Sequence, residues 1–282
     1  MARWLLIGLV LLAAAVTGCR PAAAPSAADG PPQRILSLFP SWTEVLCALG
    51  LGDRLVGRSR HCDHPPEVTR LPVVGEGFGG SLEAILRLRP DLVVVYDRDL
   101  ADRIRRLDLR ALSVQAESLD EVFAAYETIA RAAGVPGRGR ALADRVRGEI
   151  AEASRLAAGA PRPRVLFCVD GKSGHVVGPR NFVHELLLAV GADNVAADAA
   201  GPFPVYSLEA ALRKDPELIL DGSGTNGAAA VPGARTFIEG LRTTTAGRRG
   251  RIVPVSEAVV TRSGPRLGEA ARLLARIIHE AP

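Results

Sequence analysis

The stretch SLEAILR at residues 81–87, which leads into PDLV at residues 90–93, decides the fold because it occurs twice. The second copy is SLEAALR at 207–213, followed by PELI at 216–219. Each copy is typical of a helix that begins after a serine N-cap, ends before a proline and leads into a buried strand. Two copies predict two lobes of similar construction. The alternative is that two βα units converged on one favourable helix start.

Short β-rich runs alternate with amphipathic stretches on both sides of this repeat, which is typical of parallel sheets covered by helices. Helices are expected to begin at Ser41 and Ser118, each followed three residues later by a glutamate that can complete a capping box, Glu44 and Glu121. The expected strands are 34–38, 55–57, 72–74, 92–96 and 111–114 in the first lobe, and 164–169, 217–221 and 252–255 in the second.

A long helix is expected between the two sets of strands. Residues 140–158 keep apolar side chains on one face over about five turns; these are Leu142, Val146, Ile150, Ala153 and Ala157. We therefore predict an N-terminal lobe at 33–137, a linking helix at 138–160 and a C-terminal lobe at 161–282. The fold class is α/β, with two lobes that each hold a mostly parallel sheet flanked by helices, joined by one long rigid α-helix.

The N-terminus is interpreted as a signal for export. Residues 1–18 have a charged start and an apolar run at 5–16 that is too short to span a bilayer. The run ends in VTGC, which resembles a lipobox, so Cys19 is the predicted lipidation site. Residues 19–32, rich in Ala and Pro, would then form a tether. The expected location is outside the cytoplasm, at the periplasm or cell surface, with the lipid holding the protein to a membrane. An ordinary signal with a chance cysteine is the alternative.

Composition excludes several classes of protein. The chain has 282 residues with 48% hydrophobic and 23% charged residues, which excludes a disordered tail and a multipass membrane protein. The net charge is +4 and like charges do not gather in blocks, so nucleic-acid binding is not expected. Cys47, Cys62 and Cys168 allow at most one disulfide among them, and the sequence does not choose the pair.

Three local motifs offer rival chemistries, and none is complete. HCDH at residues 61–64 places four metal-ligating side chains at adjacent positions, whereas structural zinc sites use wider pairs. GSGTNG at 222–227 follows a strand, but Pro232 interrupts any helix after it, so it does not predict dinucleotide binding. GKSG at 171–174 departs from the nucleophile-elbow pattern. We therefore expect neither an enzyme nor a metal site.

Four motifs together resemble a known family. They are RILSLFPSWTE at 34–44, CDHPPE at 62–67, GPRNF at 178–182 and GPRL at 264–267. They resemble the class III periplasmic binding proteins of ABC importers, most closely the cobalamin-binding branch. The resemblance implies a monomer, lipid-anchored through Cys19, that holds a small molecule between its lobes and delivers it to a permease dimer with its ATPase. The expected ligand is a cobalamin-like corrinoid, with no resident cofactor. Haem or a ferric siderophore is the alternative ligand, and an exported α/β enzyme or a sensor domain is the alternative class.

The resemblance also implies which residues bind the ligand: Pro40, Ser41, Trp42, Phe78, Tyr96, Phe203, Arg262 and, as a looser candidate, Tyr206. Aromatic faces can cover a flat ligand, while a guanidinium binds peripheral amides or carboxylates. The chain departs from the cobalamin-binding pattern where some relatives have tryptophan, at Gly77, Tyr96 and Phe203.

Glu83 and Glu209 occupy the same place in the two copies of the repeat. In the family that the chain resembles, glutamates at these positions meet arginines of the two permease subunits, so both are predicted docking residues. The alternative is that each glutamate only complements the dipole of its own helix.

Overall fold

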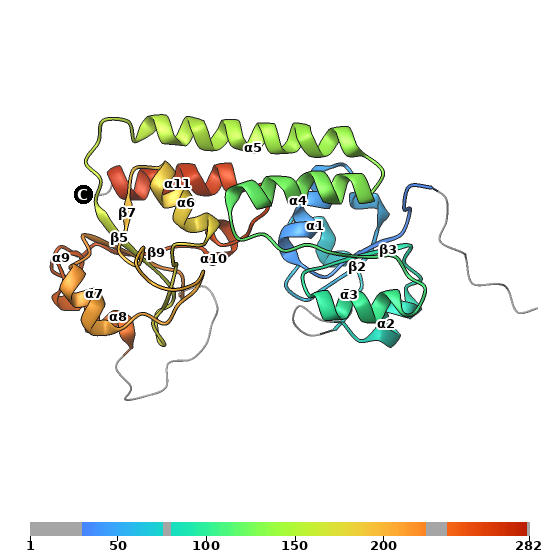
Figure 1. Cartoon of the computed structure of the whole chain (residues 1–282), viewed down its shortest axis with the longest axis horizontal. Helices are drawn as coiled ribbons and strands as arrows, with labels where there is room; N and C mark the ends of the chain where they lie inside the picture. The colour runs from blue at the N-terminus through green and yellow to red at the C-terminus, as the bar shows by residue number, and fades with distance from the viewer. Residues whose placement is uncertain (1–29, 76–79, 224–235, 281–282) are drawn as a thin grey trace, which may run out of the picture.

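The structure is a computed structural model that describes residues 30–75, 80–223 and 236–280. It shows an α/β chain of two lobes, with helix α5 (Pro136–Leu156) running along both (Figure 1). Cys19, the predicted signal and tether up to residue 29, and Phe78 lie outside the described residues. Helix α5 covers most of the predicted linking helix 138–160. It begins two residues earlier, because Pro136 fits the first turn of a helix, and it ends at Leu156.

The N-terminal lobe is built on a parallel sheet with strand order β2-β1-β3-β4. Its strands are β1 (Ile35–Ser37), β2 (Leu55–Arg58), β3 (Leu92–Val95) and β4 (Ala111–Ser113), and its helices are α1 (Pro40–Ala48), α2 (Leu82–Arg87), α3 (Arg98–Arg105) and α4 (Leu119–Ala132). Short 3-10 turns occupy Gly52–Arg54 and Pro66–Arg70. The expected strand at 72–74 is wrong: only Val73 forms an isolated bridge, to Arg58.

The C-terminal lobe has a mostly parallel sheet with order β6-β5-β8-β9, in which β7 also pairs with β5 and only β6 is antiparallel. Its strands are β5 (Arg164–Asp170), β6 (His175–Val176), β7 (Asp193–Asn194), β8 (Leu218–Asp221) and β9 (Ile252–Pro254). Its helices are α6 (Phe182–Ala189), α7 (Leu208–Lys214), α8 (Phe237–Gly240), α9 (Thr245–Arg248), α10 (Glu257–Val260) and α11 (Leu267–His279), with a 3-10 turn at Leu241–Thr243. The two-lobed α/β class is therefore confirmed.

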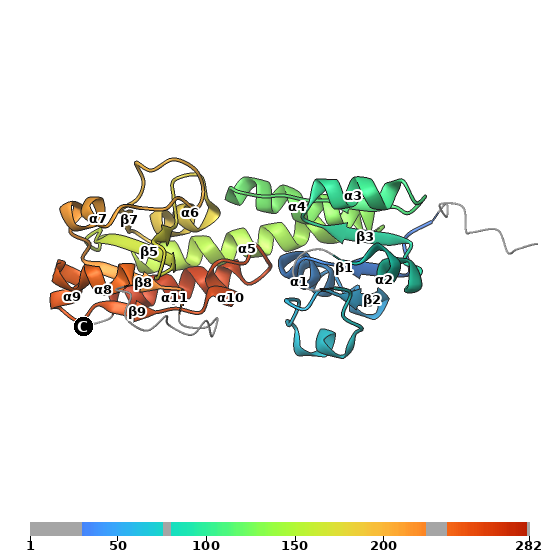
Figure 2. The same ribbon diagram turned by 90° about the horizontal axis from the view of Figure 1, so that it is seen from below.

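Each sheet is covered on both faces, as parallel sheets require. In β1, the side chain of Ile35 joins a core shared by both lobes, whereas Leu36 packs with α2 and α3 on the other face. The shared core continues through the buried face of α5 and reaches β5 at Val165 and Phe167. Figure 2 shows α5 passing behind both lobes. One continuous core thus joins the lobes along this helix.

Two glycines allow other helices to approach α5 closely. A Cβ at Gly139 of α5 would lie 2.6 Å from Ala130 Cβ and 2.8 Å from Glu127 Cα, both on α4. At the far end of α5, a Cβ at Gly268 of α11 would lie 2.4 Å from Glu149 Cβ. These contacts leave no room for any side chain, so the glycines fix α4 and α11 against opposite halves of α5.

The repeat is reproduced in backbone detail. Ser81 and Ser207 both cap their helices, accepting from the backbone N–H three residues on. Arg89 and Asp215, at matching positions after the helices, both adopt a left-handed conformation with φ of 46° and 45°. The guanidinium of Arg34 donates to the carbonyl of Arg89, at 3.1 Å, and Arg164 donates to that of Asp215, at 2.9 Å. The two copies are thus the same structural unit.

Among the described residues, no helix combines the length and hydropathy needed to cross a membrane.

Candidate functional site between the lobes

The ends of β1 and β3 bring two aromatic rings together in the N-terminal lobe. These strands are neighbours, and Leu38, the residue after β1, donates its N–H to Val94 O at 2.9 Å near the end of β3. The rings of Phe39 and Tyr96 follow and stack, with centroids 4.9 Å apart and planes 26° apart. Both side chains are half-buried. We call Phe39 and Tyr96 the aromatic platform.

Tyr96 was among the predicted ligand-binding residues, whereas Phe39 was missed. The signal for Phe39 was its place directly before the predicted Pro40, in the turn after the first strand. Burial, and next to it the charge of Glu117, raises the pKa of Tyr96. The platform therefore offers neutral aromatic surface.

The predicted role of Trp42 needs correction. Its side chain is fully buried, and its indole N–H donates to Val114 O at 3.1 Å. The N-cap of α1 is Phe39, two residues before the expected Ser41, and Trp42 lies in the first turn of this helix. Pro40 and Ser41 are buried as well. The ring of Trp42 lies 5.6 Å from that of Phe39, so Trp42 packs beside the platform. Because its side chain is fully buried, it has no surface exposed to a ligand.

Tyr206 is also a core residue. It is buried in the C-terminal lobe, and its hydroxyl donates to Val195 O at 3.3 Å and lies 3.2 Å from Asp198 Oδ1. It belongs to a buried cluster that includes Leu166 of β5 and Ile219 of β8. The structure thus gives no support to Tyr206 as a ligand-binding residue.

Phe203, by contrast, is 43% exposed. The neighbouring Pro202 O accepts from Asn181 Nδ2 at 3.1 Å, which ties this loop to the start of α6. The same turn of α6 contacts the N-terminal lobe, because Glu185 accepts from Leu119 N–H, at 2.7 Å, at the start of α4. The loop that carries Phe203 is thus tied to α6, and α6 in turn contacts the start of α4.

Arg262 bridges the lobes through ion pairs that the sequence analysis did not foresee. Its guanidinium NH1 lies 2.5 Å from Asp63 Oδ1 and 3.1 Å from Glu44 Oε1, and NH2 donates to His61 O at 3.3 Å. Arg266 binds the same Glu44 in a bidentate manner, at 2.7 and 2.8 Å. We call Glu44, Asp63, Arg262 and Arg266 the interlobe ion cluster.

The expected capping box of Ser41 and Glu44 is therefore wrong, since the N-cap is Phe39 without a side-chain hydrogen bond. Glu44 is only 1% exposed and its carboxylate is held by two arginines of the other lobe. A buried carboxylate requires such partners. The other expected capping box, Ser118 with Glu121, is present.

Asp63 differs from Glu44 in exposure, at 56% against 1%. Partial burial opposes ionisation of Asp63, but the hydrogen bond and the charge of Arg262 outweigh it and lower the pKa of this carboxyl. At neutral pH the interlobe ion cluster thus holds two negative and two positive charges. Its formal charge is zero.

A buried polar group fixes the loop that carries Asp63. Thr43 Oγ1 lies 2.8 Å from Ser37 Oγ and 3.1 Å from Cys62 Sγ, all three being fully buried. Ser37 ends β1, so Asp63 is held near the strand end that leads to the platform. Cys47, Cys62 and Cys168 are free thiols. Burial, with a further contribution from Glu44, raises the pKa of Cys47 to about 11, so this thiol is uncharged at neutral pH.

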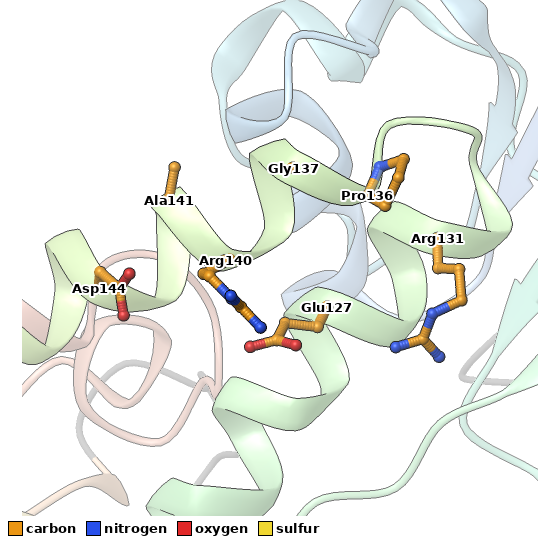
Figure 3. Close-up of a pocket in the computed structure, with 7 residues that line it drawn as sticks. All are labelled: Glu127, Arg131, Pro136, Gly137, Arg140, Ala141 and Asp144. Carbon is orange, nitrogen blue, oxygen red and sulfur yellow. The ribbon is translucent and has the colours of Figure 1, made fainter.

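The structure also shows a surface hollow of about 510 Å³ in the groove between α4 and α5 (Figure 3). Its side chains are charged and of mixed sign, with Glu127 and Arg131 from α4 and Arg140 and Asp144 from α5. None of the predicted ligand-binding residues lines it, and it offers no aromatic surface. We assign no ligand to it.

Glu83 and Glu209 lie on α2 and α7, on the side of the molecule away from α5 (Figure 1). Both are exposed, and Glu83 forms an ion pair with Arg87 at 3.1 Å. Each has an exposed leucine three residues on, Leu86 and Leu212. The two lobes therefore present the same acidic and apolar motif.

Within residues 30–75, 80–223 and 236–280, no group of three or more His, Cys, Asp or Glu side chains is arranged to hold a metal ion. The HCDH motif places Cys62 in the core and Asp63 on Arg262, so its side chains diverge.

Comparison with known proteins identifies the family. Residues 35–254 match the family model described as periplasmic binding protein. The chain belongs to this family. As a periplasmic binding protein it serves ABC transport outside the cytoplasm and is not an enzyme.

Individual relatives agree on the class and differ in ligand. The ABC transporter substrate-binding lipoprotein YvrC of Bacillus subtilis is 29% identical over 88% of this chain and 80% of its own. A vitamin B12-binding protein of Vibrio cholerae is 30% identical over 67% of this chain and 70% of its own. The solved structure of the periplasmic heme-binding protein RhuT from Roseiflexus superposes with a TM-score of 0.76 and 30% identity, over 88% of this chain and 98% of that one.

Proposed function

We propose that this periplasmic binding protein captures a cobalamin-like corrinoid between its lobes and delivers it to an ABC permease. The observation that carries the proposal is the aromatic surface in both lobes, namely the half-buried, stacked rings of the aromatic platform in one lobe and the exposed Phe203 in the other. A flat macrocycle can be covered by such faces, while polar groups at its edge need hydrogen-bonding partners. The similarity to vitamin B12-binding proteins supports this ligand.

Haem is the second candidate ligand, because the Roseiflexus heme-binding structure covers nearly the whole described chain at 30% identity. Haem is also flat, but its edge carries two carboxylates where a corrinoid carries amides. The two ligands therefore differ in the charge that they would bring to Arg262.

Calorimetric titration with cyanocobalamin, dicyanocobinamide, haem and a ferric siderophore tests the proposal. We expect one-to-one binding of the corrinoids and weaker binding of the others. Tyr96→Ala and Phe203→Ala should each weaken corrinoid binding about tenfold, since each removes one stacking face. Leu156→Ala serves as a control, because Leu156 is exposed at the end of α5. Tighter binding of haem than of either corrinoid would replace corrinoid by haem as the ligand.

We further propose that Cys19 carries the lipid anchor, a role supported by the similarity to a lipoprotein. Cys19→Ser should yield a protein without acyl chains that leaves the membrane fraction. Stable anchoring requires more than one acyl chain, so intact mass spectrometry of the wild type should show a multiply acylated protein. An unmodified, soluble wild type would contradict the anchor.

Glu83 and Glu209 are proposed to dock on the permease, supported by their equivalent, exposed places in the two lobes. The double variant Glu83→Ala and Glu209→Ala should keep its ligand affinity but slow uptake in proteoliposomes, because charge complementarity acts on association. Glu239→Ala, which removes a first-turn glutamate from α8, is the matched control. Normal uptake by the double variant would reduce both glutamates to helix-start residues.

A further inference from the structure

The interlobe ion cluster contains one carboxylate that is fixed and one that can exchange. Glu44 is buried and held by Arg262 and Arg266 together, so no ligand can reach it without breaking three contacts. Asp63 is 56% exposed and pairs with Arg262. The side chain of Arg262 is 16% exposed. A ligand that binds its guanidinium would therefore lie beside Asp63.

We propose that Asp63 determines ligand specificity by excluding carboxylates from Arg262 while admitting neutral acceptors such as amides. This inference rests on the proposed function, in that it requires a ligand between the lobes. The resemblance implies that Arg262 binds the edge of the ligand; the proposal adds that Asp63 selects which ligand edges Arg262 accepts.

The reason is the charge balance of the cluster. Glu44 and Asp63 already neutralise Arg262 and Arg266, so a ligand carboxylate would add a third negative charge beside two. It would either lie next to Asp63 and be repelled, or displace Asp63 and leave that carboxylate without its partner. A carbonyl oxygen of an amide accepts a guanidinium N–H without adding charge. The ligand edge that suits this site is therefore an uncharged one.

The position of Asp63 supports a direct effect on the ligand. The preceding residue, Cys62, contacts Thr43, which also bonds Ser37 at the end of β1. The platform residue Phe39 lies two residues after Ser37, and its carbonyl accepts a hydrogen bond from Thr43 Oγ1 at 3.1 Å. Asp63 and the platform are thus both attached to the segment at the end of β1.

The test compares two pairs of probes that differ only at the edge. Dicyanocobinamide carries amides where dicyanocobyrinic acid carries carboxylates, and haem dimethyl ester is the neutral counterpart of haem. All titrations are carried out at one pH, pH 8. The variants are Asp63→Asn, which keeps shape and removes charge, and Asp63→Ala in case the first is unstable. Asp102→Asn is the matched control, because Asp102 is also 56% exposed and paired with an arginine, on α3.

For the wild type and the Asp102→Asn control, we expect the neutral corrinoid to bind at least tenfold more tightly than its acid. Asp63→Asn should tighten binding of the acid about tenfold and leave the neutral corrinoid within about threefold of the wild type. A ratio of the two affinities that stays the same in both Asp63 variants would overturn the role of Asp63 and leave the proposed function intact.

The haem pair separates the two proposals. If neither corrinoid binds while haem or its ester does, the corrinoid proposal fails, and the ratio for the haem pair decides the role of Asp63 by the same criterion. Binding of neither pair by the wild type would overturn both. Melting curves of each variant accompany the titrations, because a folding defect would weaken both members of a pair alike.

Discussion

Two segments of this chain carry the same local pattern, a serine followed three residues later by a glutamate at a helix start, and they end in different structures. At Ser118 the glutamate folds back as a capping box. Near Ser41 the N-cap is Phe39, two residues earlier, and Glu44 pairs with Arg262 and Arg266 in the other lobe. The difference teaches that a local motif decides the role of a residue only when no stronger distant partner competes.

The largest expected effect comes from removing the charge of Glu44. Glu44→Gln should lower the free energy of unfolding by about 3 kcal/mol or more, because the arginines that it pairs lose a buried counter-charge. Ser118→Ala, at the other segment, should cost about 1 kcal/mol, the usual value of an N-cap. Denaturant unfolding monitored by circular dichroism measures both. Equal losses would show that the distant pairing adds nothing to a local cap.

Two glycines of α5 extend the same comparison at a smaller scale. Gly139→Ala should destabilise the protein by about 1–3 kcal/mol, since the new methyl group would overlap Ala130 and Glu127 on α4. At Gly148 a Cβ meets nothing within 4 Å, so Gly148→Ala should stabilise the helix by about 0.5–1 kcal/mol. Thermal unfolding of the two variants should move the melting temperature in opposite directions. A gain at both sites would contradict the close packing of α4 on α5.

The smallest expected effect concerns pH. The pKa of Asp63 is lowered in the folded protein, because Arg262 outweighs the effect of burial. The stabilisation from this pair is therefore present above the ordinary carboxyl pKa near 4 and is lost as pH falls through the lowered value. The difference in unfolding free energy between wild type and Asp63→Asn should be constant at neutral pH and shrink below about pH 4. Urea unfolding at a series of pH values measures it, and a difference independent of pH would contradict the pairing.

Sequence reasoning succeeded where the signal was local and repeated. The two copies of the repeat predicted matching helices and strands, and the apolar stripe with Leu142, Val146 and Ile150 predicted the long helix. These patterns depend on periodicity alone, which needs no knowledge of distant partners.

The site was harder to predict because an aromatic residue near a strand end can face either way. Trp42 and Tyr206 were predicted at a ligand surface and instead lie in the cores, whereas the half-buried Phe39, whose ring stacks on that of Tyr96, was not predicted. The N-cap of α1 is Phe39 and not Ser41, and Trp42 in its first turn is buried while Phe39 is half-buried. Arg262 was predicted only as a ligand-binding residue. Its ion-pair partners Glu44 and Asp63 are about 200 residues away in the chain, and no local pattern predicts these pairs.

The contacts of α5 also set an order of assembly. Its first half packs on α4, which immediately precedes it in the chain, so these two helices can form a hairpin as soon as both are made. Its second half packs on α11, where Gly268 contacts Glu149, and more than a hundred residues of chain separate these two positions. Contacts between such distant segments form slowly because a long loop must close first. We therefore expect the N-terminal lobe and α5 to fold first and the C-terminal lobe to fold onto them. The arginines that join the lobes lie in the segment just before α11, so their ion pairs with Glu44 should form last.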